Sequence, residues 1–325
     1  MSYDEMDRPR RRRPGAPAIA AAVLVPAAAL AGWLAMESVN GAPESGPPPA
    51  TKTAGETPGE KPGGKPGEKP REKPGESSDD GKPGGREPLK GRTVVVDPGH
   101  NPGNFRHTDE INAPVDIGTN RKPCDATGTS TDDGYTEAAF TRDVSHRLRA
   151  LLEEQGARVV FTHDGERPFG PCVDERARIG NAARADAVVS VHADGSARGH
   201  RGFHLILPGP VRAGAADTGR IVGPSRELGE RIAGAFGRAT GTDPSNYAGG
   251  GTGLDVRTDL GGLNLSTVPK VFIECGNMRD PADAALLTSA GWRQRAAQGI
   301  ADGLRAHLTA RPGPPPAASP EPDVS

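Results

Sequence analysis

Between residues 91 and 310, short apolar runs alternate with amphipathic segments, and few folds accommodate that pattern. The apolar runs are rich in β-branched residues and predict strands, as at Thr93–Val96. Apolar side chains at helical spacing predict a helix over Glu137–Glu154. Further strands are expected at 158–162, 187–191, 202–207 and 271–274, and further helices at 173–184, 225–240, 281–288 and 292–308. The alternation predicts a single α/β domain with a mostly parallel, twisted sheet flanked by helices.

On both sides of this body, the chain is too poor in apolar residues to form a core. Of the 325 residues, 45 are glycine and 33 are proline, and many of these lie in residues 37–90 among lysines and glutamates. Such a composition predicts a disordered, extended linker. Residues 311–325 are also Pro-rich and are expected to be disordered. The folded body is therefore expected to span residues 91–310.

The N-terminus has the pattern of an export segment. Residues 1–15 contain a cluster of arginines, and Ala16–Met36 follow without a charge. As a helix this segment would extend roughly 32 Å, enough to cross a hydrocarbon core. We expect a signal anchor with the basic segment in the cytoplasm, or a signal peptide cleaved near Ala29–Ala31. In both cases the rest of the chain is exported.

Charge and cysteine content exclude two classes of protein. The 40 basic residues nearly balance the 42 acidic ones, for a net charge of −2. This balance excludes a chain-wide electrostatic interaction with nucleic acid. Three cysteines are too few for a disulfide-built scaffold and do not have zinc-finger spacing. What remains is an enzyme or a binding domain carried on a tether.

Histidines and carboxylates lie where the expected strands end. His100 follows the first strand, while His192 and Glu274 close two others; Glu137 begins the long helix. Open α/β sheets bind ligands outside the carboxyl ends of their strands. Two histidines and one carboxylate are the ligands of many catalytic zinc sites, and a second carboxylate can serve as a base. Each residue also has an ordinary interpretation: a structural histidine, or for Glu137 a charge favoured by the helix dipole.

Four motifs follow one another along the body: Thr-Val-Val-Val-Asp-Pro-Gly-His (93–100), Gly-Tyr-Thr-Glu (134–137), Ser-Val-His-Ala-Asp (190–194) and Val-Phe-Ile-Glu-Cys-Gly-Asn (271–277). Their order resembles that of zinc-dependent N-acetylmuramoyl-L-alanine amidases. It is most similar to the short-form enzymes of high-GC Gram-positive bacteria, which share Gly-Pro-Cys-Val-Asp-Glu-Arg (170–176). The resemblance implies that His100, Glu137 and His192 bind one zinc ion and that Glu274 is catalytic.

The implied reaction is hydrolysis of the amide between the lactyl group of N-acetylmuramic acid and L-alanine of the stem peptide. Zinc-activated water would cleave this bond, with Glu274 as general acid and base. Weaker candidates for substrate binding are Arg257, Asn264 and Asn277. The implied partner is peptidoglycan, bound by a monomer. That monomer would be membrane-anchored and face the cell wall, or would be secreted if its N-terminal segment is cleaved.

The resemblance also bears on Cys124 and Cys172, which each lie in a Pro-containing segment. Related short-form enzymes pair such cysteines, which implies a disulfide here; two unpaired loop cysteines are the alternative. Cys275 is expected to be a buried thiol, because no activating histidine is specified nearby. Arg176 and Asn181 match an Arg and an Asn that the family has before its second histidine.

Two other functions are compatible with the same residues. A zinc peptidase cutting within the stem peptide would use the same metal and base, because both serve any amide. A non-catalytic wall-binding module with this fold would be expected to lack a ligand or the base, and none of the four is missing here. Mass spectrometry of muropeptide digests would separate the three possibilities.

Overall fold

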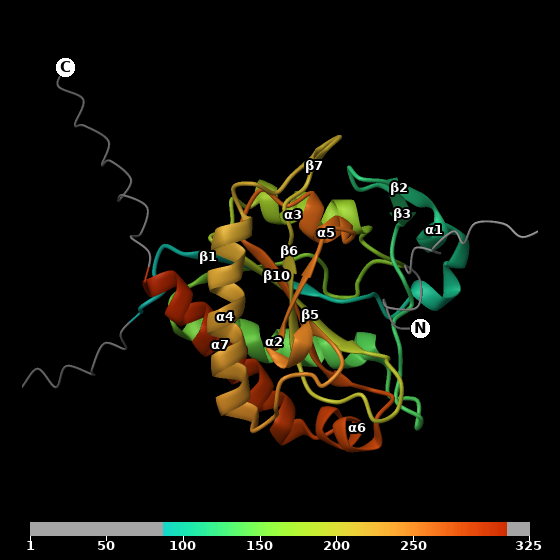
Figure 1. Ribbon diagram of the computed structural model, residues 1–325, viewed down its shortest axis with the longest axis vertical. Helices are drawn as coiled ribbons and strands as arrows, with labels where there is room; N and C mark the ends of the chain where they lie inside the picture. Colours follow the sequence, from blue (N-terminus) through green and yellow to red (C-terminus); the bar gives the residue numbers. More distant parts are fainter. Residues whose placement is uncertain (1–86, 311–325) are drawn as a thin grey trace, which may run out of the picture. The chain divides into compact units, whose positions relative to one another are not determined.

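The computed structural model describes residues 87–310, which form a six-stranded sheet covered by helices (Figure 1). The strand order is β4 (Arg158–Phe161), β1 (Thr93–Pro98), β5 (Ala187–Asp194), β10 (Lys270–Asn277), β6 (His204–Pro208) and β9 (Leu254–Arg257). The first four strands are mutually parallel, β6 is antiparallel to β10, and β9 is parallel to β6. The carboxyl ends of β4, β1, β5 and β10 therefore meet at one edge of the sheet.

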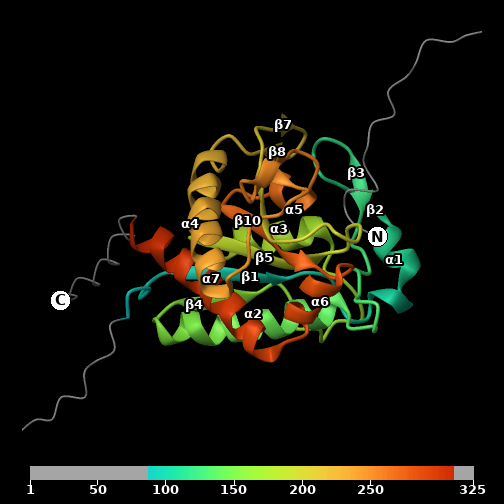
Figure 2. The same ribbon diagram turned by 60° about the horizontal axis from the view of Figure 1, so that its bottom comes forward.

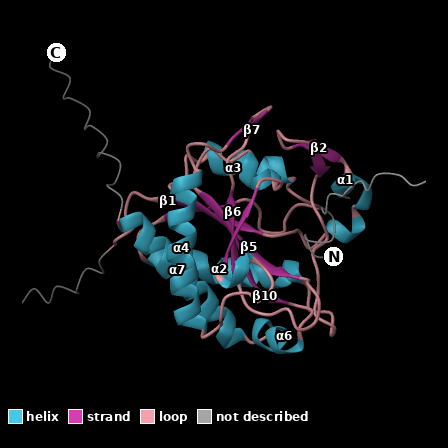
Figure 3. Ribbon diagram, in the orientation of Figure 1, coloured by secondary structure: helices cyan, strands magenta, loops and turns pink. Residues whose placement is uncertain are grey.

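Helices lie on both faces of the sheet (Figure 3). One face packs against α2 (Glu137–Glu154), α4 (Val222–Thr240) and α7 (Ala290–Thr309), with α6 (Pro281–Leu287) next to α7. The other face packs against α3 (Val173–Ala182) and α5 (Gly261–Asn264). Figure 2 shows α2 on one side of β1 and β5 and the pair α3 and α5 on the other.

The remaining elements are short and lie in the connections. They are η2 (Asn104–Arg106), α1 (Thr108–Asn112), the hairpin of β2 (Pro114–Asp116) and β3 (Arg121–Pro123), the hairpin of β7 (Arg212–Ala213) and β8 (Ala216–Asp217), and η3 (Gly249–Gly251). Between β1 and α2, the chain thus crosses a long connection with little regular structure. This connection borders the site described below.

Local sequence explains where the main elements begin and which face they bury. Val94 and Val96 of β1 join the larger core on the α2 side, and Val95 joins a smaller cluster on the other face, as the two-residue period of a strand requires. In α2, buried apolar residues recur every four positions, as at Phe140 and Val144. The side chain of Thr136 caps this helix by accepting a hydrogen bond from the Ala139 amide.

The predicted fold class is confirmed, with differences at the ends and in the second half. Strands β5 and β10 continue to Asp194 and Asn277, because these two strands keep pairing past the predicted ends at Val191 and Glu274. Strand β9 and helix α5 were not predicted. They are four residues long each and carry too few apolar side chains to show a period.

Several predictions concern segments outside the described residues. They are the basic segment 1–15, the apolar segment 16–36, the tail 311–325, and residues 37–86 of the linker predicted over 37–90. Within residues 87–310, no helix has both the length and the apolar character needed to cross a membrane.

Candidate metal centre

Three buried side chains converge at the carboxyl edge of the parallel strands: His100, Glu137 and His192. The Oε1 atom of Glu137 is 3.1 Å from Nε2 of His100 and 3.0 Å from Nδ1 of His192. One ligand atom from each residue lies within 4.8 Å of the others. Each residue is only 2 to 5 % exposed. Two nitrogens and a carboxylate oxygen at this spacing are a donor set that suits a divalent transition metal.

Three different elements supply these residues. His100 follows the end of β1 by two residues and has a backbone φ of 61°, a left-handed conformation that is uncommon for a non-glycine residue. Glu137 is the first residue of α2, and His192 lies in β5. Two glycines leave room for the three side chains. A Cβ at Gly99 would overlap the His192 ring, and one at Gly128 would lie 3.0 Å from Oε2 of Glu137.

Hydrogen bonds outside the three residues set which ring nitrogens face Glu137. Nδ1 of His100 donates to the Ala126 carbonyl at 3.0 Å, so Nε2 is the atom that faces the carboxylate. The Ser190 hydroxyl donates to a carboxylate and lies 3.2 Å from Nε2 of His192, so Nδ1 of that ring faces Glu137. The nitrogens that could bind a metal are thereby oriented toward one point, as the outer partners of metal-binding histidines usually ensure.

The charges of the three residues depend on one another. Burial by itself would raise the pKa of Glu137, but His100 and then His192 hold it well below its ordinary value. Burial would lower the pKa of His100, but the adjacent Glu137 carboxylate raises it to about 9. The pKa of His192 is lowered, mainly by burial. Without a metal, this site therefore holds a carboxylate next to a protonated histidine, and a cation would compete with that proton.

Glu274 lies beside this group rather than within it. The sheet register pairs Glu274 with His192 on one side and with His204 on the other, so these three side chains emerge on the same face. Glu274 is buried like the other three residues. The prediction that a second carboxylate would reach the same edge as the histidines agrees with this placement.

Two cavities lie near His100 and Glu137. A cavity of about 590 Å³ is lined by residues that include Asn101, Phe105 and Arg279. A second cavity of about 480 Å³ is lined by residues that include Lys122 and Arg257. Both are lined by Thr127 and Gly128, and a Cβ added at Gly128 would lie 2.9 Å from the His100 ring and 3.0 Å from the Glu137 carboxylate.

Of the three predicted substrate-binding residues, Arg257 lines the second of these cavities. Its guanidinium donates two hydrogen bonds to Asp259, at 2.9 and 2.7 Å. Asn264 is buried and donates to the Thr258 carbonyl. Asn277 is buried and donates to two loop carbonyls. Both amides thus hold loop carbonyls in this structure, and the substrate role of Asn264 and Asn277 stays a prediction.

Cys124 and Cys172 are joined by a disulfide, with their Cα atoms 4.3 Å apart. The bond links the segment after β3 to the residue that precedes α3. Cys275 is a buried thiol whose pKa is raised by burial. The disulfide agrees with the pairing that the resemblance implied, and Cys275 is the buried thiol expected from its sequence surroundings.

A group of buried charges next to the histidines was not predicted. It consists of Asp97, Asp125, Arg176 and Lys270, which are joined by ion pairs of 2.7 to 3.2 Å. Asp97 and Arg176 each belong to a sequence motif, but their pairing with each other and with Asp125 and Lys270 was not expected. A signal was present nonetheless, because Asp97 follows three valines in a buried strand, and a buried carboxylate requires a partner.

Fold and site together define a class: an α/β metal-dependent hydrolase with a two-histidine, one-carboxylate centre. Residues 94–306 match the family model described as N-acetylmuramoyl-L-alanine amidase. The chain belongs to this family, which confirms the resemblance seen in its motifs.

Individual relatives agree with this assignment. The chain is 40 % identical over 221 residues to N-acetylmuramoyl-L-alanine amidase Rv3717 of Mycobacterium tuberculosis, covering 68 % of this chain and 88 % of that protein. The crystal structure of the amidase Ami1 from Mycobacterium smegmatis has a TM-score of 0.63 and 38 % identity, covering 69 % of this chain and 99 % of that one. The apo form of Ami1 from Mycobacterium abscessus has a TM-score of 0.61 and 39 % identity, covering 68 % and 100 %.

Proposed function

We propose that this chain hydrolyses the amide bond between the lactyl group of N-acetylmuramic acid and the L-alanine of the stem peptide in peptidoglycan. Membership of the amidase family and the 40 % identity to a mycobacterial amidase support this reaction. The observation that carries the proposal is the buried convergence of His100, Glu137 and His192 at the carboxyl edge of the sheet.

We propose one zinc ion as the cofactor, held by Nε2 of His100, Nδ1 of His192 and the Glu137 carboxylate. Two imidazoles with one carboxylate, and space for a fourth ligand, form a donor set that catalytic zinc sites use. When bound, zinc supplies a Lewis acid that polarises a carbonyl and acidifies water. The donor set disfavours the hard cations Ca²⁺ and Mg²⁺, which prefer all-oxygen sites.

Glu274 is the proposed proton-transferring residue. Its position opposite His192 in the sheet register, on the same face, supports this role, and it is not one of the three grouped metal-binding candidates. There it accepts a proton from the attacking water and delivers the proton to the leaving amine of L-alanine. Glu137 cannot take this role, because both of its oxygens are engaged by backbone amides and the two histidines.

Arg257 is the proposed contact for a carboxylate of the stem peptide. It lines the 480 Å³ cavity together with Lys122 and Asp259, and this cavity adjoins the metal centre at Gly128. Arg279 lines the 590 Å³ cavity. Charged side chains therefore line both cavities, where we propose that they orient a polymeric substrate.

The parts of the chain around the catalytic body have proposed roles as well. We propose residues 91–310 as a monomeric catalytic domain, carried on a linker over residues 37–90. Residues 16–36 would anchor it to the membrane or be removed as a signal peptide. An exported or wall-associated location suits an amidase of peptidoglycan. Fractionation with and without a Lys substitution in the middle of segment 16–36 would test the anchor.

Muropeptide digestion followed by mass spectrometry tests the reaction. Free stem peptides together with intact glycan strands support the amidase, and cuts within the peptide would instead identify a peptidase. No product at all, from protein with a full complement of zinc, would indicate a binding module. His100→Ala is the control, because it removes one ligand and should remove both the metal and the products.

A further inference from the structure

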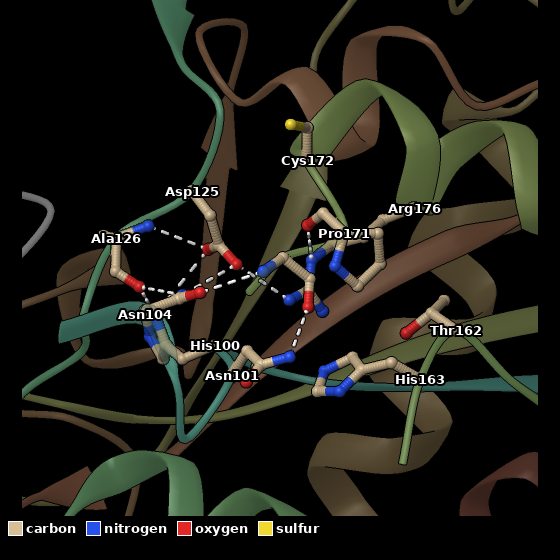
Figure 4. A network of polar contacts seen from close by, with 12 residues as sticks. His100, Asn101, Asn104, Asp125, Ala126, Thr162, His163, Pro171, Cys172 and Arg176 are labelled. Carbon is tan, nitrogen blue, oxygen red and sulfur yellow. Dashed lines mark hydrogen bonds and ion pairs between the residues drawn. The ribbon is translucent and has the colours of Figure 1, made fainter. Parts of the chain in front are cut away.

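Arg176 is the centre of a buried charge network next to the metal centre (Figure 4). It lies in α3 and is 5 % exposed. Its guanidinium donates to Asp97 at 2.7 Å, to Asp125 at 3.0 Å, and to the carbonyls of Pro98 and Pro171 at 2.7 and 2.9 Å. A planar fork can join several acceptors in fixed directions, which the single ammonium of a lysine cannot do.

The Asp125 branch of this network reaches His100. Asp125 accepts the Ala126 amide at 2.8 Å through Oδ1 and the Arg176 guanidinium through Oδ2. Asn104 donates to the same Oδ2 and to the Ala126 carbonyl, at 3.1 and 2.7 Å. The Ala126 carbonyl in turn accepts the Nδ1 hydrogen of His100. Figure 4 shows these residues grouped around the His100 ring.

The Asp97 branch reaches His192. Asp97 accepts Arg176 through Oδ1 and the Ser190 hydroxyl through Oδ2, the latter at 2.9 Å. The Ser190 oxygen lies 3.2 Å from Nε2 of His192. Lys270 also binds Oδ2 of Asp97, at 3.2 Å. Each histidine therefore has the nitrogen that faces away from Glu137 connected to one of the two carboxylates that Arg176 holds.

We propose that Arg176 is a positioning residue that orients both metal-binding histidines through these two branches. The inference rests on the proposed ligand set and adds to it a residue that touches neither metal nor substrate. Orientation matters here because His100 has a left-handed backbone (φ 61°), which the surrounding contacts must maintain. Outer partners of this kind commonly determine the ring tautomer and the metal affinity of a site.

Zinc affinity of the full-length Arg176→Lys variant is the main test. Lysine keeps the charge that Asp97 and Asp125 need but cannot hold both in fixed directions. We expect the dissociation constant for zinc, measured by competition with a chromophoric chelator, to rise by about 10–100-fold. The visible absorption of the cobalt-substituted variant should also change, because it reports ligand geometry directly.

Arg92→Lys is the matched control. Arg92 is 8 % exposed, donates to Asp186 at 3.0 Å and to the Leu308 carbonyl, and precedes β1 at the opposite end of that strand from Asp97. The substitution has the same chemistry and a similar burial, but it lies away from the histidines. It should lower the melting temperature while leaving zinc affinity and the cobalt spectrum unchanged.

Ser190→Ala separates the two branches, because it removes only the hydroxyl between Asp97 and His192. We expect a weaker zinc affinity and an altered cobalt spectrum, together with the loss of stability that removing one buried hydrogen bond brings. Wild-type affinity and spectrum in Arg176→Lys would overturn the proposal. If Arg176→Lys does not fold, a wild-type zinc affinity and cobalt spectrum in Ser190→Ala would overturn the proposal. Failure of the wild-type chain to bind zinc stoichiometrically would instead refute the ligand set.

Discussion

Replacing Gly128 by alanine should destabilise the fold and should also weaken zinc binding directly, by moving a proposed metal ligand. Gly128 has a φ of 78°, a left-handed conformation that costs an L-residue about 1–2 kcal/mol. For a domain of this size, that loss lowers the melting temperature by about 2–8 °C. In addition, the new Cβ would lie 2.9 Å from Cδ2 of His100 and 3.0 Å from Oε2 of Glu137. Contacts this short force one of the two side chains to move.

Gly134→Ala is a matched control in the same connection. Gly134 has a φ of 83°, and a Cβ built there meets no atom within 4 Å. Both variants therefore carry the same backbone strain, but only Gly128→Ala displaces a proposed metal ligand. We expect its dissociation constant for zinc to exceed that of Gly134→Ala by about 10–100-fold, the usual effect of disturbing the surroundings of a ligand.

Two measurements on each variant separate strain from ligand displacement. Melting temperatures in excess chelator measure the cost of each substitution without metal, and Gly128→Ala should fall further because its Cβ also overlaps His100 and Glu137. Each tenfold loss in affinity removes about 1.4 kcal/mol of the stabilisation that a fixed zinc concentration provides. Zinc should therefore stabilise Gly128→Ala less than Gly134→Ala. Equal zinc affinities in the two variants would refute the placement of Gly128 against the metal centre.

Three more predictions concern the base, the disulfide and acid stability. Glu274→Gln should keep its zinc while release of stem peptide from purified peptidoglycan falls by ~10²–10⁴; loss of zinc would make Glu274 a ligand instead. Cys124→Ser should destabilise the oxidised protein by about 4 kcal/mol for a separation of 48 residues, with little added effect from Cys172→Ser, whereas additive losses would argue against a shared bond. Burial by itself would raise the pKa of Asp97, but Lys270 and Arg176 lower this pKa well below its ordinary value. The ionised Asp97 side chain therefore stabilises the folded protein fully above the unfolded pKa of about 3.9, and this stabilisation is lost as the pH falls further. Denaturant titrations between pH 6 and pH 2 should show this loss, and an equally steep loss in Asp97→Asn would contradict it.

Local pattern was sufficient for the main elements. Strand β1 and helix α2 begin where predicted, because a run of valines and a four-residue apolar period are properties of neighbouring residues alone. The candidate metal ligands could also be named, since residues that follow parallel strands must reach the same edge of a sheet. His100, His192 and Glu274 do lie at that edge.

The ion pairs and hydrogen bonds between residues far apart in the sequence were decided only by the tertiary structure. Arg176 meets Asp97 and Asp125 across 79 and 51 residues, and no local period signals such a contact. The burial of Asn264 and the hydrogen bond from its amide to the Thr258 carbonyl are likewise visible only in the fold. The antiparallel direction of β6 likewise depends on how β10 and α4 pack, not on its own residues. Residue types and periods are local properties, whereas burial and hydrogen-bond partners depend on which segments the chain brings together.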